Sequence, residues 1–245
     1  MSDSVISKME HMHWLDGAGR IIHPAWAAIP HGFWGRRDLT TSLPQPLMRC
    51  RQVHGIKLIH AAAIAAANNP PGPVESLSPE ADGVYSTEPG VSCAVQSADC
   101  LPILFHSLQT PFVAAVHAGW RGLTSGILAE TVALYRRLGD PCHLMIGIGP
   151  AIGSARFEVG PDVLTALRQN SMGLTPEQLA AVIIKGKKDR WHIDLAAAAA
   201  LQLTNLGIPA AQIFIMRSCT FEDHERWYSF RREGKGCGMN ISWIG

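Results

Sequence analysis

The sequence of 245 residues has no excess of charge of either sign and no long apolar run. Its 21 Lys and Arg residues nearly balance its 20 Asp and Glu residues, which gives a formal net charge of +1. A protein that binds nucleic acid or an anionic membrane surface through charge shows a clear basic excess. No uncharged apolar stretch reaches the roughly 18 residues that a membrane-spanning helix needs. We therefore expect neither nucleic acid nor a membrane among its partners.

Close cysteine pairs are also missing, although the chain has six cysteines. They are Cys50, Cys93, Cys100, Cys142, Cys219 and Cys237. No two of them form a C-x-x-C pair, so the spacing indicates neither a disulfide framework nor a zinc ribbon. The first 14 residues show no basic segment followed by an apolar one, which is the pattern of a secretory signal. A cytoplasmic protein with reduced thiols is the expectation that follows.

Hydrophobic residues make up 47% of the chain, enough for a sizeable core. Short apolar runs bounded by polar, Gly or Pro residues predict buried strands. These runs are residues 91–96, 101–106, 112–117, 143–153 and 211–218. Apolar spacing and end signals predict helices. The helical segments are residues 124–139, 160–170, 175–186 and 194–207, and the third opens with the capping-box pair Thr175 and Gln178.

The order of these segments bears on the fold class. Strands and helices alternate irregularly, which predicts a layered α/β or α+β fold. The run Asn-Asn-Pro-Pro-Gly-Pro at residues 68–73 is typical of a loop. The loop need not be a domain linker, because apolar strand-like runs follow at once. The first 50 residues are rich in His, Trp, Pro and Gly and show only weak periodicity, so they predict strands and loops of uncertain order.

Three residues point to a reactive site. Cys100 stands directly before the run 101–106, in SADCLPILF, and a free cysteine is most often a small buried hydrophobe. His117 ends the run 112–117 and leads into a glycine turn, where α/β active sites commonly lie. His54 precedes a glycine in RQVHG. One Cys with two His matches the three ligands and open fourth position of a catalytic zinc. Spacing alone leaves Cys100 as core, nucleophile or ligand.

Six motifs resemble, in order, those of the laccase-domain (YfiH-type) family, whose members are regarded as purine nucleoside phosphorylases. The motifs are RQVHG, SADCLPILF, VAAVHAGWRGL, IGPAIGSARFEVG, HIDL and RSCTF…WYSFRREG. They run from about Arg51 to Arg232, and the pair ADCLP and HAGWRG is highly specific. The resemblance implies one domain over residues 1–245, with mixed β-sheets sandwiched by helices, an α+β (mixed α/β) fold.

The resemblance also implies a chemistry. It places a zinc ion on His54, Cys100 and His117, and it implies phosphorolysis of adenosine, inosine and methylthioadenosine, with adenosine deaminase as a side activity. Nucleoside and phosphate are then the small-molecule partners of a monomer or weak homo-oligomer. A zinc centre lowers the pKa of a bound water to about 7 or polarises a substrate oxygen. A thiolate ligand favours zinc, with copper second, over magnesium.

The match departs from the family pattern in two places. The segment 1–50 is shortened and keeps only an HGF-x-x-R start before RQVHG. The Thr-Gly-Arg that the family carries after its Arg-Arg pair is absent, and Gly238 stands where that arginine would be. Substrate contacts carried by those segments are therefore open.

Further candidate residues lie in the same motifs. Asp99, beside Cys100, orients a ligand histidine, acts as a base, or only forms a turn. Arg121, in the glycine turn, is a candidate for bidentate phosphate binding. The candidate catalytic residues are Asp99, Cys100, His117 and Arg121. The candidate substrate-binding residues are Gln52, Glu158, Ser229, Arg231 and Arg232. Because adjacent residues of a strand face opposite ways, we expect only one of the last two arginines to enter the site.

Three other functions remain open on the sequence. A copper polyphenol oxidase is implied by the family's older name, although the only His-x-His pair is His11 with His13, outside the matched region. A cysteine hydrolase, including an editor of peptidoglycan precursors, would use Cys100 as nucleophile and His117 as base. A nucleoside-binding module without turnover is the third.

Overall fold

A six-stranded mixed sheet forms the centre of the molecule. This computed structural model describes residues 20–21, 24–38, 43–67, 79–170 and 173–245. The strand order is β12-β8-β6-β7-β4-β3. The bounds are β3 (Leu58–His60), β4 (Gly83–Ser86), β6 (Leu101–Ser107), β7 (Val113–Ala118), β8 (Leu144–Ile148) and β12 (Ile213–Ile215). The four inner strands pair antiparallel, whereas each outer strand runs parallel to its neighbour.

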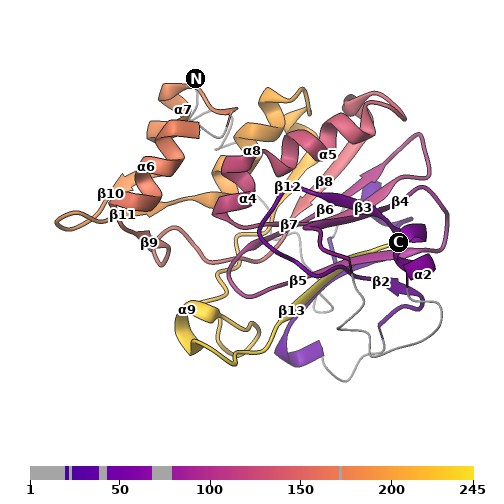
Figure 1. The fold of residues 1–245 in the computed structure, drawn as a ribbon, viewed down its shortest axis with the longest axis horizontal. Coiled ribbons are helices and arrows are strands. Elements are labelled where there is room, and N and C mark those ends of the chain that lie inside the picture. The colour runs from indigo at the N-terminus through magenta and orange to yellow at the C-terminus, as the bar shows by residue number, and fades with distance from the viewer. Residues whose placement is uncertain (1–19, 22–23, 39–42, 68–78, 171–172) are drawn as a thin grey trace.

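Two smaller sheets complete the β-structure. One has the order β1-β13-β5-β2 and packs against the central sheet. Its strands are β1 (His31–Trp34), β2 (Leu47–Met48), β5 (Ser92–Ser97) and β13 (Asn240–Ile244). The other, of order β10-β11-β9, lies at one end of the molecule (Figure 1). Its strands are β9 (Glu158–Val159), β10 (Ile183–Lys185) and β11 (Trp191–Ile193).

The described residues contain seven α-helices. Their bounds are α2 (Ala61–Ala67), α4 (Trp120–Ser125), α5 (Ile127–Tyr135), α6 (Pro161–Asn170), α7 (Pro176–Val182), α8 (Leu195–Asn205) and α9 (Phe230–Glu233). Short 3₁₀ turns are η1 (Pro24–Trp26), η2 (Arg36–Asp38), η3 (Pro141–His143) and η5 (Ala210–Gln212). Among these residues no helix is long and apolar enough to cross a membrane.

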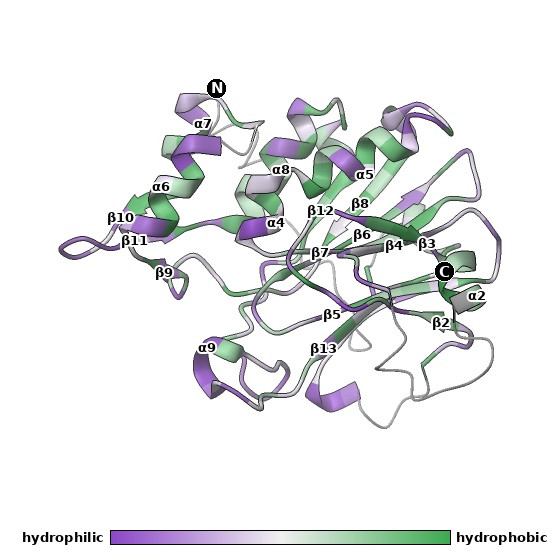
Figure 2. Ribbon diagram, in the orientation of Figure 1, coloured by the Kyte–Doolittle hydropathy of each residue, from purple (hydrophilic) through white to green (hydrophobic). Residues whose placement is uncertain are grey.

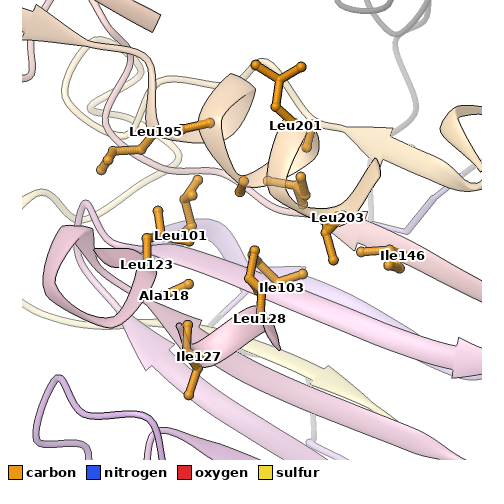
Figure 3. Packing of buried hydrophobic residues seen from close by; sticks show 14 of the residues in the cluster. Leu101, Ile103, Ala118, Leu123, Ile127, Leu128, Ile146, Leu195, Leu201 and Leu203 are labelled. Carbon is orange, nitrogen blue, oxygen red and sulfur yellow. The ribbon is translucent and has the colours of Figure 1, made fainter. Parts of the chain in front are cut away.

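The inner part of the central sheet is buried on both faces, because every residue of β6 and of its neighbour β8 is buried. Alternate side chains of β6 point to opposite faces. Leu101 and Ile103 pack toward α5 and α8 (Figure 3), and Leu104 packs into the cluster shared with the four-stranded sheet. Figure 2 accordingly shows a largely hydrophobic centre and a hydrophilic loop between β10 and β11. A double-faced core makes β6 a rigid base for residues at its ends.

Most of the expected elements are confirmed. The runs 91–96, 101–106 and 112–117 are the core of β5, β6 and β7, and Thr175 with Gln178 forms the capping box that starts α7. The mixed α/β, single-domain class is confirmed. Helices cover one face of the central sheet, while the second sheet covers most of the other. The expected loop at residues 68–73 and the pair His11 and His13 lie outside the described residues.

Candidate metal centre

His54, Cys100 and His117 come together at one end of the central sheet. His54 lies in the loop before β3, Cys100 directly precedes β6, and His117 lies in β7. The antiparallel register pairs Leu101 with Ala118, so the start of β6 lies beside the end of β7. One potential ligand atom from each of the three residues lies within 4.8 Å of the others. This group is able to hold a metal ion.

The three side chains differ in exposure, which leaves the centre open on one side. His117 is buried, Cys100 is half-buried and His54 is exposed. The Cys100 Sγ atom lies 4.0 Å from His54 Nε2, and the two imidazole rings meet edge to face with centroids 4.9 Å apart. An open side is what a catalytic centre needs and what a structural zinc site lacks.

Gly119 permits this close approach. An added Cβ atom at position 119 would lie 2.9 Å from Cys100 Sγ and 3.3 Å from His54 Cδ2. The backbone of Gly119 is extended, with φ of −70°, so side-chain space and not conformation requires glycine here. The glycine turn expected after His117 therefore fills a packing role beside the centre, and α4 begins at the next residue.

Asp82, a residue that the sequence analysis did not single out, links two of the three candidate ligands. Its Oδ1 atom accepts hydrogen bonds from His117 Nδ1 at 2.9 Å and from the His54 backbone N–H at 2.9 Å. Its Oδ2 atom accepts from the backbone N–H groups of Gly55 at 2.6 Å and Val53 at 3.2 Å. The carboxylate is fully buried. An aspartate directly before a buried strand, in ADGVYS, was the available signal.

Charge is distributed unevenly over the group. Burial would raise the pKa of the Cys100 thiol, but hydrogen bonds with His117 and His54 outweigh burial and lower this pKa to about 7. Burial would lower the pKa of His117, but its hydrogen bonds with Asp82 and Cys100 raise it to about 9. Burial also opposes ionisation of Asp82, yet the His117, Gly55 and Val53 hydrogen bonds lower its pKa. Cys100 thus carries thiolate character near neutral pH.

Backbone strain is concentrated here. Three non-glycine residues of the described structure have positive φ, and two of them, His54 at 61° and Asp99 at 88°, belong to this site. Left-handed backbone disfavours side chains other than glycine and recurs at functional sites. The loop before β3 and the turn before β6 are therefore held in place by their surroundings.

Asp99 does not orient a ligand histidine; Asp82 does. The Asp99 Oδ1 atom accepts the Thr220 hydroxyl at 2.6 Å, and Oδ2 accepts the Arg231 backbone N–H at 2.7 Å. Asp99 forms a turn, as one of the three alternatives expected, and it also attaches the first turn of α9 to the segment that carries Cys100. Both carboxylate oxygens are occupied, which leaves Asp99 a poor general base.

The strand expected around Arg231 and Arg232 is wrong, because these residues lie in helix α9. The Ser229 hydroxyl caps this helix by accepting the Arg232 backbone N–H at 3.3 Å. Arg231 is exposed, and its Nη1 atom donates to the backbone carbonyls of Arg156 at 3.1 Å and Glu158 at 3.2 Å. The half-buried Arg232 guanidinium donates to three carbonyl oxygens, those of Thr220, Phe221 and Trp227. Arg232 therefore fastens α9 to the loop before it.

The other candidate residues also have structural partners. The Gln52 amide donates to the Gln96 carbonyl at 2.6 Å and accepts the Gln96 N–H at 2.8 Å. Glu158 is exposed in β9, with its carboxylate 3.8 Å from His192 Nε2. Arg121 is exposed in the first turn of α4 and stacks 4.4 Å over the Trp120 ring. Of the candidate cations, Arg121 and Arg231 are the exposed ones.

The donor set suits a soft or borderline divalent metal. A thiolate with two imidazole nitrogens is a zinc set, and copper accepts the same donors. Because Asp82 accepts the proton of His117 Nδ1, the Nε2 atom is the one that would bind a metal, and it would lose its proton on binding because the pKa of His117 is raised to about 9. The residues present therefore fit zinc, and copper fits the same atoms.

Comparison with known proteins agrees with this geometry. Residues 35–245 match the family model described as multi-copper polyphenol oxidoreductase laccase. The chain is 37% identical over 203 residues to the purine nucleoside phosphorylase YfiH of Shigella flexneri, covering 83% of this chain and 75% of that protein. It is 32% identical over 242 residues to the purine nucleoside phosphorylase slr1573 of Synechocystis, covering 89% and 90% of the two chains.

Solved structures give the same result. Protein NMB0706 of Neisseria meningitidis superposes with a TM-score of 0.70 at 32% identity, covering 85% of this chain and 77% of that one. YlmD of Geobacillus stearothermophilus superposes with a TM-score of 0.73 at 30% identity, covering 81% and 73%. Because the family model and these relatives agree, the chain belongs to the laccase-like polyphenol oxidoreductase family. Several of its relatives are named purine nucleoside phosphorylases.

Proposed function

We propose that this protein is a zinc-dependent purine nucleoside phosphorylase that acts on adenosine, inosine and methylthioadenosine, with adenosine deamination as a side activity. The observation that carries the proposal is the convergence of His54, Cys100 and His117 within 4.8 Å, in a chain whose relatives bear the phosphorylase name. Small-molecule substrates follow from the same relatives. The cytoplasmic location and the monomer or weak homo-oligomer remain predictions.

The reaction needs a cation for phosphate and a stable position for the reacting carbon. A phosphate oxygen attacks C1′ of the ribose while the bond from C1′ to the purine nitrogen breaks, and that nitrogen leaves with the bonding pair and takes up a proton. A bound zinc ion supplies a positive charge that stabilises an oxygen or nitrogen on which negative charge develops. Arg121, exposed beside the centre, is the candidate phosphate ligand because its planar guanidinium suits bidentate binding.

Helix α9 forms another part of the proposed substrate site. Asp99 holds its first turn close to Cys100 through the Arg231 backbone. Both arginines of this helix donate to backbone carbonyls, but Arg231 is exposed and Arg232 is half-buried, so Arg231 is the better candidate of the two for a substrate contact. Ser229, Gln52 and Glu158 support the proposal only as parts of the framework, since each has a partner within the protein.

One assay tests the proposal. Purified protein is incubated with adenosine, with and without phosphate and with and without a chelator, and the products are separated by chromatography. We expect adenine only when phosphate and metal are present, and inosine as a minor product. The variant His117→Ala should lose the metal and phosphorolysis together. Phosphorolysis that survives removal of the metal would contradict the zinc-dependent mechanism.

A cysteine hydrolase is the second candidate, and a specific observation favours it. Cys100, His117 and Asp82 form a thiol–imidazole–carboxylate series in which the Cys100 pKa is lowered to about 7. Alkylation separates the two functions. A zinc-bound Cys100 resists iodoacetamide until a chelator is added, whereas a nucleophilic Cys100 reacts at once and turnover stops.

The polyphenol oxidase of the family name is tested by metal analysis. A multicopper oxidase requires several copper sites, and within the described ranges a single His/Cys group has metal-binding geometry. We expect about one zinc per chain in protein purified without added metal. Several copper ions per chain, with oxidation of a phenolic substrate, would establish the oxidase instead.

A further inference from the structure

The two candidate histidine ligands share one carboxylate. Asp82 lies directly before β4 and is fully buried. It accepts four hydrogen bonds, one from the His117 ring and three from the backbone around His54. We propose that Asp82 is a positioning residue that selects the tautomer of His117 and, through the same carboxylate, fixes the loop that carries His54. The inference rests on the proposed metal function of these ligands.

The tautomer follows from the chemistry of the carboxylate. An ionised carboxylate only accepts hydrogen bonds, so the His117 Nδ1 atom, 2.9 Å from Oδ1, must carry a proton. Nε2 then presents its lone pair toward Cys100 and His54 whenever the ring is neutral. The backbone strengthens the alignment, because the His117 N–H donates to the Asp82 carbonyl at 2.7 Å. Ring and main chain of His117 are thus both fixed by Asp82.

The loop around His54 depends on the same residue for a different reason. The His54 side chain is exposed, so packing does little to hold it. Its backbone has a φ of 61°, which is unfavourable for a non-glycine residue. Three consecutive N–H groups, from Val53 to Gly55, converge on the Asp82 carboxylate and compensate for this conformation. His54 is therefore placed by its main chain, and Asp82 holds that main chain.

The variant Asp82→Asn separates tautomer selection from simple support. The asparagine amide replaces one of the two acceptor oxygens by an NH₂ group, which only donates. With its NH₂ group at the Oδ2 position, it would face two backbone donors, those of Val53 and Gly55. With NH₂ at the Oδ1 position, it faces one backbone donor and His117 Nδ1. The second orientation has fewer conflicts, and it forces the neutral ring to carry its proton on Nε2, which blocks that atom as a ligand.

The experiment compares wild type, Asp82→Asn and Asp82→Ala. Protonation of His117 Nδ1 is read by ¹⁵N NMR of histidine-labelled, metal-free protein at a pH well above 9, where the ring is neutral and the tautomer is defined. Zinc affinity is measured by competition with a chromogenic chelator, and stability by urea unfolding. Asp140→Asn is the matched control for zinc affinity, because the exposed Asp140 carboxylate also accepts a backbone N–H group, that of Cys142, but lies before β8, near the end of β6 opposite to Cys100.

We expect a protonated Nδ1 in the wild type and an unprotonated Nδ1 in Asp82→Asn. Zinc affinity should fall 10- to 100-fold in Asp82→Asn, the range typical for partners of metal ligands. Asp82→Ala leaves four donors unsatisfied, three of them backbone N–H groups around His54. It should be the less stable variant, and it should also lose zinc affinity because the loop that carries His54 is released. Asp140→Asn should bind zinc as the wild type does.

Two results would overturn the inference. One is an unprotonated His117 Nδ1 in the wild type, which needs no variant to fold. The other is wild-type zinc affinity in Asp82→Asn, since a reversed tautomer of His117 must weaken the site. A wild-type protein that binds zinc but does not cleave adenosine would contradict the proposed phosphorylase and leave this inference intact.

Discussion

At the scale of single residues, the side chains of Cys100 and His54 pack closely against the backbone of Gly119. Its missing side chain leaves room that any other residue would fill, since an added Cβ would lie 2.9 Å from the Cys100 sulfur. Overpacking of this kind typically costs about 1–3 kcal/mol. The backbone conformation at Gly119 is one that alanine adopts without strain. The energetic cost of an added Cβ therefore comes from displacing the side chains of Cys100 and His54.

Gly119→Ala should therefore weaken zinc binding at least about tenfold, which corresponds to the lower half of that energy range. Isothermal titration or chelator competition measures the change. Ser125→Ala, an exposed substitution at the end of the same helix, is the control and should bind zinc as the wild type does. Equal affinity in Gly119→Ala would mean that the metal draws its ligands from another group of residues.

A second residue-scale prediction concerns His106, which lies far along β6 from the centre. It is 1% exposed, neither ring nitrogen has a hydrogen-bond partner of normal geometry, and Trp26 packs edge-on 4.6 Å away. Burial lowers the pKa of His106 from 6.5 to about 4. The unfolded chain therefore takes up a proton near pH 6.5, while the folded chain does not until about pH 4.

The contribution of neutral His106 to the free energy of unfolding is fully present above pH 6.5 and is lost as the pH falls toward 4. The loss is about 3 kcal/mol, since one pKa unit corresponds to about 1.36 kcal/mol. Urea unfolding across this pH window should show a steeper loss in the wild type than in His106→Leu. His224→Leu, at an exposed position, serves as the control and should keep the wild-type slope. Equal slopes in wild type and His106→Leu would mean that His106 is protonated in the folded state.

The sequence identifies site residues when they stand in specific motifs. It does not identify them when their role depends on which strands pair in the folded sheet. His54, Cys100 and His117 stand in specific motifs, and the structure brings them together. Asp82 carries no such motif. Its importance arises because β4 pairs with β7, which places Gly83 opposite Val116 and so Asp82 beside His117. That register is a property of the folded sheet and is not written in any local pattern.

At the scale of elements, the short helix α9 is what joins the substrate side of the site to the ligand side. Ser229 is fully buried and caps the helix by accepting the Arg232 N–H. An N-cap of this type contributes about 1 kcal/mol. Without it, the first turn of α9, and with it the Arg231 N–H that binds Asp99, loses its support.

Ser229→Ala should lower the free energy of unfolding by about 1 kcal/mol and raise KM for nucleoside, with kcat changed less. Ser229→Thr retains a hydroxyl cap and should recover most of the stability. Chemical denaturation and steady-state kinetics report the two effects. A raised KM with unchanged stability would instead identify Ser229 as a direct substrate contact.

Elements with a strong local signal are also the ones that sequence predicts. The runs that became β6 and β7 are apolar along their length, and α7 and α8 begin at the caps Thr175 and Asp194. Helix α9 has four residues and no apolar periodicity, so its Arg-Arg pair was expected on a strand. The Ser229 cap is local, but the Asp99 contact that holds the first turn of this helix is tertiary, with its partners 132 positions apart in the chain.

At the scale of the whole molecule, the three ligands tie together separate parts of the chain. His54 precedes the edge strand β3, Cys100 directly precedes the inner strand β6, and His117 lies in the inner strand β7. A metal that binds only the folded chain stabilises it, by about 2.7 kcal/mol when its free concentration is one hundred times Kd. In a protein of this size, 1 kcal/mol shifts Tm by about 2–4 °C.

We therefore expect a saturating concentration of zinc to raise Tm by about 5–10 °C over chelator-treated protein, measured by circular dichroism. Cys100→Ser should remove most of this increment while keeping the metal-free Tm close to that of the wild type. An identical increment in Cys100→Ser would place the stabilising metal elsewhere on the molecule.

The left-handed backbone at His54 and Asp99 has a consequence for how such a chain drifts under mutation. Each of these residues holds a conformation that glycine adopts at lower energy, by about 1 kcal/mol or more. Glycine would relieve this energy, but at position 54 it would remove a candidate zinc ligand and at position 99 the attachment of α9. Libraries screened for thermal survival without zinc should therefore accumulate glycine at position 54, whereas saturating zinc should retain histidine there, because the lost metal stabilisation of about 2.7 kcal/mol exceeds the relieved strain.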